Sequence, residues 1–197
     1  MAAPIFITPP SRQATYLTAS QAWLRGGKFI DQKSGGISDP DVPSDIVNRE
    51  PPRDGQIASA GNPFAFKLDG VRDEFGNEWN ASPVRNGDAF TVDITFGGAV
   101  KIRRISAYLT QANWDSNQPL TRAQFDLASP VYRRAFSAAP YSEADEEIPV
   151  GLVAPTPLTF SFNLPQRSVG HHVVLLEIDH PDSGDATYQV IDLRFVS

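Results

Sequence analysis

Proline and glycine interrupt this chain so often that long helices are disfavoured over most of its length. The sequence contains 17 prolines and 14 glycines, scattered rather than gathered in one linker. Proline removes a backbone donor and glycine weakens regular elements, so this spacing favours short strands joined by irregular loops. We therefore expect a protein built mainly of β-strands.

Several segments between these breakers alternate apolar and polar residues with the period of two that is typical of strands. They lie at about residues 90–96, 158–164, 172–178 and 187–196. In the third of these, Val173 and Leu175 make the second face apolar as well, as in the interior of a sandwich. Another strand is expected over residues 100–110, where Arg103-Arg104 breaks the alternation as a bulge would. The pattern predicts an all-β fold, an antiparallel β-sandwich.

The chain shows no repeat, low-complexity tract or linker, so we expect a single domain over residues 1–197. Residues 13–66 contain few alternating runs and many breakers, although residues 18–24 favour a turn or two of helix. This predicts a long irregular loop region after the first strand. Loops of this length inside a compact domain are often functional.

Charge and residue usage exclude several classes of function. The chain has 17 basic and 23 acidic residues, a net charge of −6, so we expect no nucleic-acid partner. No apolar run approaches the ~20 residues of a membrane span. The absence of cysteine excludes disulfides, thiolate zinc sites and cysteine nucleophiles.

The opening Met1-Ala2-Ala3-Pro4-Ile5 lacks a signal-peptide pattern. We expect the chain to be cytoplasmic as synthesised, with release or leaderless export as its route outward.

Segments spread over nearly the whole chain resemble one family. They are Pro10-Ser11-Arg12, Asp-Gly-Gln-Ile-Ala-Ser-Ala-Gly at 54–61 with Leu68-Asp69 and Trp79, Tyr108-Leu109-Thr110 with Trp114-Asp115 and residues 118–122, and residues 170–175 and 186–192. In order and spacing they are similar to the bacterial chitin-binding proteins, the lytic polysaccharide monooxygenases with a chitin-binding type-4 domain. The resemblance implies an immunoglobulin- or fibronectin-III-like antiparallel β-sandwich with a long irregular loop after the first strand. It also implies that Trp79 and Trp114 are core residues.

The copper-binding residues of the resembled family are not matched. Those enzymes hold one copper ion with an amino-terminal histidine and a second histidine, whose nitrogens suit copper. The matched positions here are Ala3 and the turn at residues 97–100, and Thr187 stands where the family usually has an aromatic residue near the metal. The resemblance therefore implies a divergent member without the copper site. We assign no catalytic residue, metal ligand or cofactor.

Three histidines remain in the chain. His171 and His172 are neighbours on one expected strand, so their side chains point to opposite faces and do not readily share a metal. His172 lies among apolar residues, and we expect a structural role for it. Residues 179–185, which include His180, could hold a divalent cation through carboxylate oxygens, but we interpret them as a solvated turn. An active copper enzyme would need another site, for instance one using His171 or His180.

The resemblance places the polysaccharide-binding surface in the long loop region. A flat sugar ring stacks on an exposed aromatic ring, and polar side chains bond its hydroxyl groups. The candidate binding residues are Tyr16, Trp23, Phe29, Asn48 and Glu50. The alternative for the aromatic members is that they pack the loop onto the sandwich. The leading hypothesis is a non-catalytic module that binds chitin or another β-linked polysaccharide.

The alternative hypothesis is a protein-interaction role on the same scaffold. A toxin component, a secretion-associated effector or one half of a two-part assembly would account for the missing signal-peptide pattern and the absent cysteines. Both features are unusual for a protein that reaches an extracellular polymer by ordinary export. An obligate protein partner would distinguish this role from sugar binding.

Overall fold

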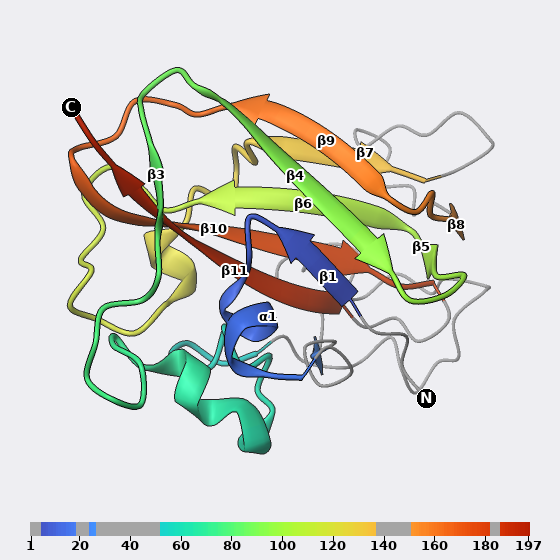
Figure 1. Ribbon diagram of the computed structural model, residues 1–197, viewed down its shortest axis with the longest axis horizontal. Helices are drawn as coiled ribbons and strands as arrows, with labels where there is room; N and C mark the ends of the chain where they lie inside the picture. The colour runs from blue at the N-terminus through green and yellow to red at the C-terminus, as the bar shows by residue number, and fades with distance from the viewer. Residues whose placement is uncertain (1–4, 19–23, 27–51, 137–150, 182–185) are drawn as a thin grey trace.

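The computed structural model describes residues 5–18, 24–26, 52–136, 151–181 and 186–197 (Figure 1). The strands are β1 (Ile5–Thr8), β2 (Arg25–Gly26), β3 (Ser82–Val84), β4 (Ala89–Phe96), β5 (Lys101–Ile102), β6 (Arg104–Leu109), β7 (Tyr132–Ala135), β8 (Leu152–Val153), β9 (Leu158–Asn163), β10 (Gly170–Asp179) and β11 (Ala186–Phe195). The helical elements are α1 (Arg12–Tyr16) and the 3₁₀ helices η2 (Pro63–Asp69) and η3 (Arg122–Gln124). None of the helices in these ranges is long and apolar enough to cross a membrane.

Two main sheets pack face to face. One has the strand order β1-β4-β9, and the other has the order β2-β11-β10-β6-β7, with β3 added to β11. The strands β5 and β8 form a small third sheet. Among the described strand pairs, β3 with β11 runs parallel and the others run antiparallel. The predicted antiparallel β-sandwich is confirmed, with this one parallel addition.

The inner core lies between the two main sheets. Every second residue of β4 is buried, and β9 repeats the pattern, as the alternation in the sequence predicts. The side chains that face them from the larger sheet include Val174, Leu176 and Ile178 of β10. The burial of this apolar surface is the main force that holds the two sheets together.

A second core covers the outer face of the larger sheet. Val173 and Leu175 of β10 are buried there with Val190 of β11, beneath Ile57 and Leu68 from the segment that contains η2. Figure 1 shows α1 and η2 together on this side of the molecule. The described part of the long loop region is thus a structural layer, which explains why β10 is apolar on both faces.

The strand expected over residues 100–110 is interrupted at Arg103 rather than bulged. The residues before it form β5, which pairs with β8, whereas β6 joins the larger sheet. The backbone N–H of Arg103 donates to the carbonyl oxygen of Asp179 (2.7 Å), and the Arg104 guanidinium pairs with the Asp179 carboxylate (2.9 Å). The alternation fails here because the chain changes sheets and buries an ion pair.

Helix α1 begins at Arg12 with Ser11 as its N-cap, earlier in the chain than the turn expected over residues 18–24, most of which lie outside the described ranges. The Ser11 hydroxyl oxygen accepts from the backbone N–H of Ala14 (3.0 Å), the usual N-cap contact. The Gln13 side chain donates to the Ala58 carbonyl oxygen (2.7 Å) and accepts from the Val190 N–H (2.9 Å). These buried contacts fix the helix between β11 and the loop layer.

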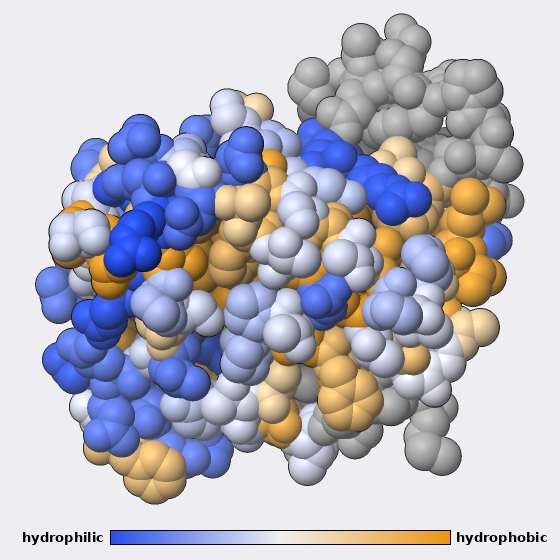
Figure 2. All heavy atoms as spheres, turned by 45° about the horizontal axis from the view of Figure 1, so that its top comes forward, coloured by the Kyte–Doolittle hydropathy of each residue, from blue (hydrophilic) through white to orange (hydrophobic). Residues whose placement is uncertain are grey.

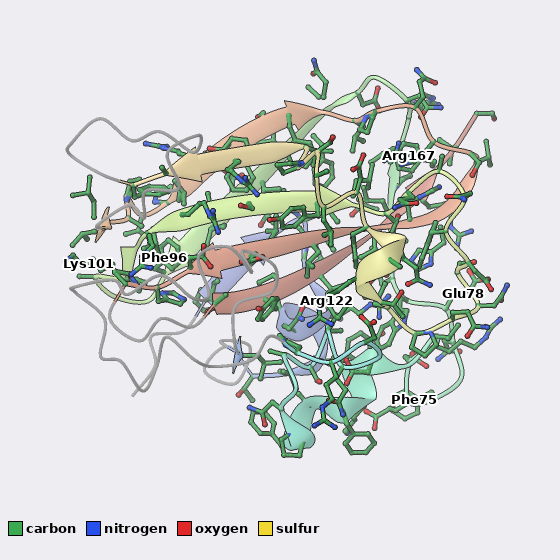
Figure 3. All side chains as sticks on the ribbon, turned by 180° about the vertical axis from the view of Figure 1, so that it is seen from behind. Phe75, Glu78, Phe96, Lys101, Arg122 and Arg167 are labelled. Atoms are coloured by element: carbon green, nitrogen blue, oxygen red, sulfur yellow. The ribbon has the colours of Figure 1, made fainter. Side chains whose placement is uncertain are left out.

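The strands define two ends of the sandwich, which Figure 3 shows from behind. At the Phe96 end, β4 and β10 finish and β11 begins, with Phe96 and Lys101 as labelled markers. At the Glu78 end, β10 begins and β11 finishes, with Glu78 and Phe75 as markers.

Replacement of Leu175 by alanine is expected to lower the free energy of unfolding by about 2–5 kcal/mol, because its side chain is fully buried in the second core. Urea denaturation followed by tryptophan fluorescence measures this change. The matched control is Leu152→Ala on exposed β8, expected to cost less than about 0.5 kcal/mol. A negligible cost at Leu175 would contradict the burial of this outer face.

Candidate functional site

A buried ion pair between Arg12 and Asp192 organises the outer face of β11. The guanidinium donates from Nε to Oδ2 (2.8 Å) and from Nη2 to Oδ1 (2.7 Å), with the two side chains only 3% and 1% exposed. Its Nη1 donates to the Leu68 carbonyl oxygen (3.1 Å), and its carbon lies 4.3 Å from the centre of the Trp79 ring. One side chain of α1 therefore joins β11, η2 and a buried aromatic ring.

His171 binds the same carboxylate from the neighbouring strand β10. Its Nε2 lies 2.7 Å from Asp192 Oδ1, and the ring is about one-fifth exposed, so it connects the buried pair to the surface. Trp114 donates from Nε1 to the His171 carbonyl oxygen (2.8 Å). Burial raises the pKa of Asp192, but the charge and hydrogen bonds of Arg12, together with His171, outweigh it and hold the pKa below its ordinary value.

An open pocket lies beside His171 at the Glu78 end. Its polar lining consists of Arg72, Glu78, Ser116, Asn117, His171 and Arg194, and Val71 and Trp79 complete it. Arg194 at the end of β11 forms an ion pair with Glu78, and this hydrogen bond and charge lower the pKa of the Glu78 carboxyl group. Figure 2 shows that this end of the molecule has a mainly hydrophilic surface.

A tight turn joins two residues of the pocket lining and presents an exposed ring. Asp73 Oδ1 accepts from the backbone N–H groups of Phe75 (2.9 Å) and Asn77 (2.7 Å), as in an Asx turn. The N–H of Asp73 donates to the Asn77 carbonyl oxygen (3.0 Å) and closes the turn between Arg72 and Glu78. The Phe75 side chain is 77% exposed and projects from the Glu78 end (Figure 3).

Tyr16 is the one predicted binding residue within the described ranges. Its ring packs edge-on against Trp79, with centroids 5.1 Å apart. Burial and the nearby Asp73 and Asp192 carboxylates raise the pKa of Tyr16. The half-buried ring thus packs the loop onto the sandwich, which is the second of the two alternatives for it. The other predicted binding residues, Trp23, Phe29, Asn48 and Glu50, lie outside the described residues.

Two exposed phenylalanines on η2 were missed by the sequence reasoning. Phe64 is 52% exposed and Phe66 is 68% exposed, whereas Ala65 and Leu68 on another side of the helix are buried. A 3₁₀ helix has three residues per turn, so residues 65 and 68 share one side and the two rings flank it. The available signal was the Phe-Ala-Phe-Lys-Leu run at 64–68, whose apolar residues separate into buried and exposed positions only when that period is applied.

The Phe96 end contains the positions at which the family resemblance implies copper. The turn at residues 97–100 supplies no imidazole, and Ala3 lies outside the described residues. Thr187 is fully buried, and its Oγ1 lies 2.8 Å from His180 Nε2. In the part of the chain that the structure describes, no group of three or more His, Cys, Asp or Glu residues could hold a metal ion. Among the described residues, the matched turn at 97–100 and the buried Thr187 supply no imidazole for a copper ion.

The interpretation of residues 179–185 as a solvated turn is wrong for the first three of them. Asp179 is 2% exposed and pairs with Arg104, and His180 is fully buried against Thr187. Pro181 is also buried, and residues 182–185 lie outside the described ranges. The sequence pattern suggested that these residues are exposed to solvent, because it does not reveal their buried partners on other strands.

His172 has the structural role that the sequence predicts. It is buried, its Nδ1 lies 3.0 Å from Thr110 Oγ1, and its ring packs edge-on against Phe195. Burial, with the nearby Arg167 charge, lowers its pKa to about 4, so it is neutral at physiological pH. Of the two tryptophans expected in the core, Trp79 is buried, whereas Trp114 is half-buried at the edge of the second core.

Comparison with known proteins identifies the family. Residues 5–193 match the family described as lytic polysaccharide mono-oxygenase, cellulose-degrading. The chain belongs to this lytic polysaccharide mono-oxygenase family. The resemblance inferred from the sequence is thus confirmed.

Two relatives of this chain are longer proteins of which it matches only a part. The GlcNAc-binding protein A of Vibrio campbellii is 34% identical over 147 residues, which are 73% of this chain and 26% of that protein. The protein of the same name from Vibrio vulnificus (strain YJ016) is 32% identical over 145 residues, again 26% of its length. The chain therefore spans about a quarter of the length of these relatives.

Solved structures match the whole chain. A chitin binding domain from Burkholderia pseudomallei is 33% identical, with a TM-score of 0.79 and coverage of 98% of this chain and 100% of that domain. An AA10 lytic polysaccharide monooxygenase from Streptomyces lividans is 24% identical, with a TM-score of 0.70 and coverage of 97% and 99%. The similarity to the Streptomyces lividans enzyme shows that the two chains share a fold.

Stability is expected to fall in acid through Asp192. Its pKa is lower in the folded than in the unfolded chain, where it is about 3.9, so the ionised group stabilises the fold above that pH. This stability is lost as the pH falls through the folded-state pKa. Asp192→Asn should remove that part of the pH dependence and cost about 3–5 kcal/mol near neutral pH, because it leaves the Arg12 charge buried without its partner.

Urea denaturation of both proteins across the acidic range measures this effect. Glu74→Gln, which removes an exposed carboxylate paired with Lys67, serves as the control and should leave the slope unchanged. An Asp192→Asn protein with the same acid slope as the unaltered chain would rule out this role.

Proposed function

We propose that this chain is a non-catalytic module that binds chitin or another β-linked polysaccharide. The observation that carries the proposal is the pair of exposed rings on η2, Phe64 and Phe66. Exposed apolar side chains grouped on one element mark an interaction surface. Two relatives carry the words GlcNAc-binding and chitin binding in their names, which supports a sugar polymer as the ligand.

The rings of η2 stand on a fixed base. Ala65 and Leu68 are buried beneath them, and the Leu68 carbonyl oxygen accepts from Arg12. At the end of the helix, Asp69 Oδ1 accepts from the Ser59 N–H (2.8 Å). A surface that is ordered before binding loses less conformational entropy when a ligand arrives. Such a base suits contact with a rigid polymer.

The residues at the Phe96 end support a role without copper chemistry. Neither Ala3 nor the turn at residues 97–100 carries the imidazole that a copper ligand set would use. The His180 ring already contacts the Thr187 hydroxyl through Nε2 and faces the Lys101 carbonyl oxygen through Nδ1 (3.4 Å). This ring would have to leave both contacts to bind a metal.

Retention on chitin and cellulose beads is the direct test. The unaltered chain should be retained on at least one polymer, and a Phe64→Ala and Phe66→Ala double variant should bind about tenfold more weakly, a loss of ~1.4 kcal/mol. The control is Phe6→Ala, which removes a ring that is 55% exposed on β1, in the smaller sheet. It should be retained like the unaltered chain.

Three results would count against this proposal. Absence of retention on both polymers would overturn polysaccharide binding and favour the protein-interaction alternative, which co-purification from native cells would then examine. Equal retention of the double variant and the unaltered chain would refute the η2 surface. Loss of retention in Trp23→Ala alone would assign binding to the loop surface predicted from the sequence.

Calorimetric titration with Cu²⁺ tests the proposed absence of copper chemistry. We expect no tight site with one-to-one stoichiometry, because the described residues do not supply a set of imidazole ligands. A tight stoichiometric site would contradict the proposal. In that case, His171→Ala and His180→Ala would show whether either remaining histidine forms the site.

A further inference from the structure

The pocket at the Glu78 end has the lining of a site for a hydroxyl-rich molecule. Arg72 and Arg194 supply planar N–H donors, and Glu78 supplies carboxylate acceptors. Asn117 and Ser116 can each donate and accept. Sugar hydroxyl and acetamido groups need both kinds of partner within a small space, and this lining offers both.

The charges in the pocket are two guanidinium groups and one carboxylate, and one of the guanidinium groups pairs with that carboxylate. Glu78 is paired with Arg194, and its lowered pKa keeps it ionised at neutral pH. Arg72 is close enough to contribute to that shift. An anionic ligand would face the Glu78 carboxylate, and a cationic ligand would face two guanidinium groups. A neutral sugar can bond to either member of the Glu78–Arg194 pair.

The lining is held in place before any ligand binds. The His171 ring is fixed by Asp192, and its backbone carbonyl oxygen by Trp114. Asn117 is positioned by a turn in which its N–H donates to Asp115 Oδ1 (2.9 Å). Binding to such a site orders few side chains, which favours affinity.

The stacking ring for such a ligand is Phe75 rather than Trp79. Arg12 covers the Trp79 ring and Tyr16 packs edge-on against it, so Trp79 is 4% exposed. Phe75 lies at the tip of the turn whose two ends line the pocket. The neighbouring Glu74 pairs with Lys67 of η2 (2.8 Å), so this turn is attached to the element that carries the exposed rings.

We propose that this pocket binds one neutral sugar residue of a β-linked chain, with Phe75 contacting a neighbouring residue. The inference rests on the proposed function for the class of ligand, and it assigns a sugar site separate from the η2 rings. Glu78, Arg194 and Asn117 bond the hydroxyl and acetamido groups, and the His171 ring borders the bound residue.

The test is titration of the full chain with a soluble trisaccharide of N-acetylglucosamine, and in parallel with cellotriose, followed by calorimetry and by amide NMR shifts. At least one sugar should bind and shift the amides of His171, Arg194 and Phe75. Glu78→Gln and Asn117→Ala should each weaken binding about tenfold, ~1.4 kcal/mol. Both are surface changes, and the Glu78 pair is exposed, so neither should unfold the protein.

Further variants separate this pocket from the η2 surface. Phe75→Ala should weaken binding of the trisaccharide more than binding of N-acetylglucosamine itself, titrated in the same way. The Phe64→Ala and Phe66→Ala double variant should bind the trisaccharide like the unaltered chain even though it loses retention on the polymer. Failure of the η2 proposal therefore leaves trisaccharide binding intact.

Several outcomes would overturn the pocket proposal. They are the absence of any sugar-dependent shift at His171 and Arg194, unchanged affinity in both Glu78→Gln and Asn117→Ala, and tighter binding of glucuronic acid than of the neutral sugars. Polymer retention without trisaccharide binding would refute the pocket and leave the η2 proposal standing.

Discussion

The pairing of Arg12 with Asp192 is the interaction on which both proposed binding surfaces depend. Two opposite charges buried this completely are costly to remove from water, and their attraction offsets that cost only when further hydrogen bonds satisfy the remaining polar atoms. Here Leu68 and His171 provide those bonds. The pair therefore fixes one arrangement of α1, η2 and two strands. This arrangement positions both the η2 rings and the residues that line the pocket.

The strands could be predicted from the sequence because local alternation reports burial directly. The clearest case is β4, in which Phe90 and Ile94 face the inner core as expected. The family resemblance was equally informative, since its motifs are the packed segments of the fold. The break at Arg103 and the burial of Asp179 could not be predicted, because they depend on partners that are distant in sequence.

Candidate binding residues were harder to choose than strands. The sequence does not distinguish an exposed aromatic ring in a loop from a packed one. The Tyr16 ring packs against Trp79. Exposure of Phe64 and Phe66 follows from the three-residue period of a short helix, which sequence alone does not reveal. The pocket joins side chains from separated segments, such as Asn117 and Arg194, and only the folded chain brings them together.

The contact between His180 and Thr187 limits how the Phe96 end could change in evolution. Both side chains are fully buried, so the space that an aromatic ring at position 187 would need is already filled. Enlarging one side chain in a packed interior typically costs about 1–3 kcal/mol unless a neighbour shrinks with it. A larger side chain introduced alone at position 187 would therefore destabilise the fold. A larger residue at position 187 would need a smaller one beside it, so these two positions are constrained to change together.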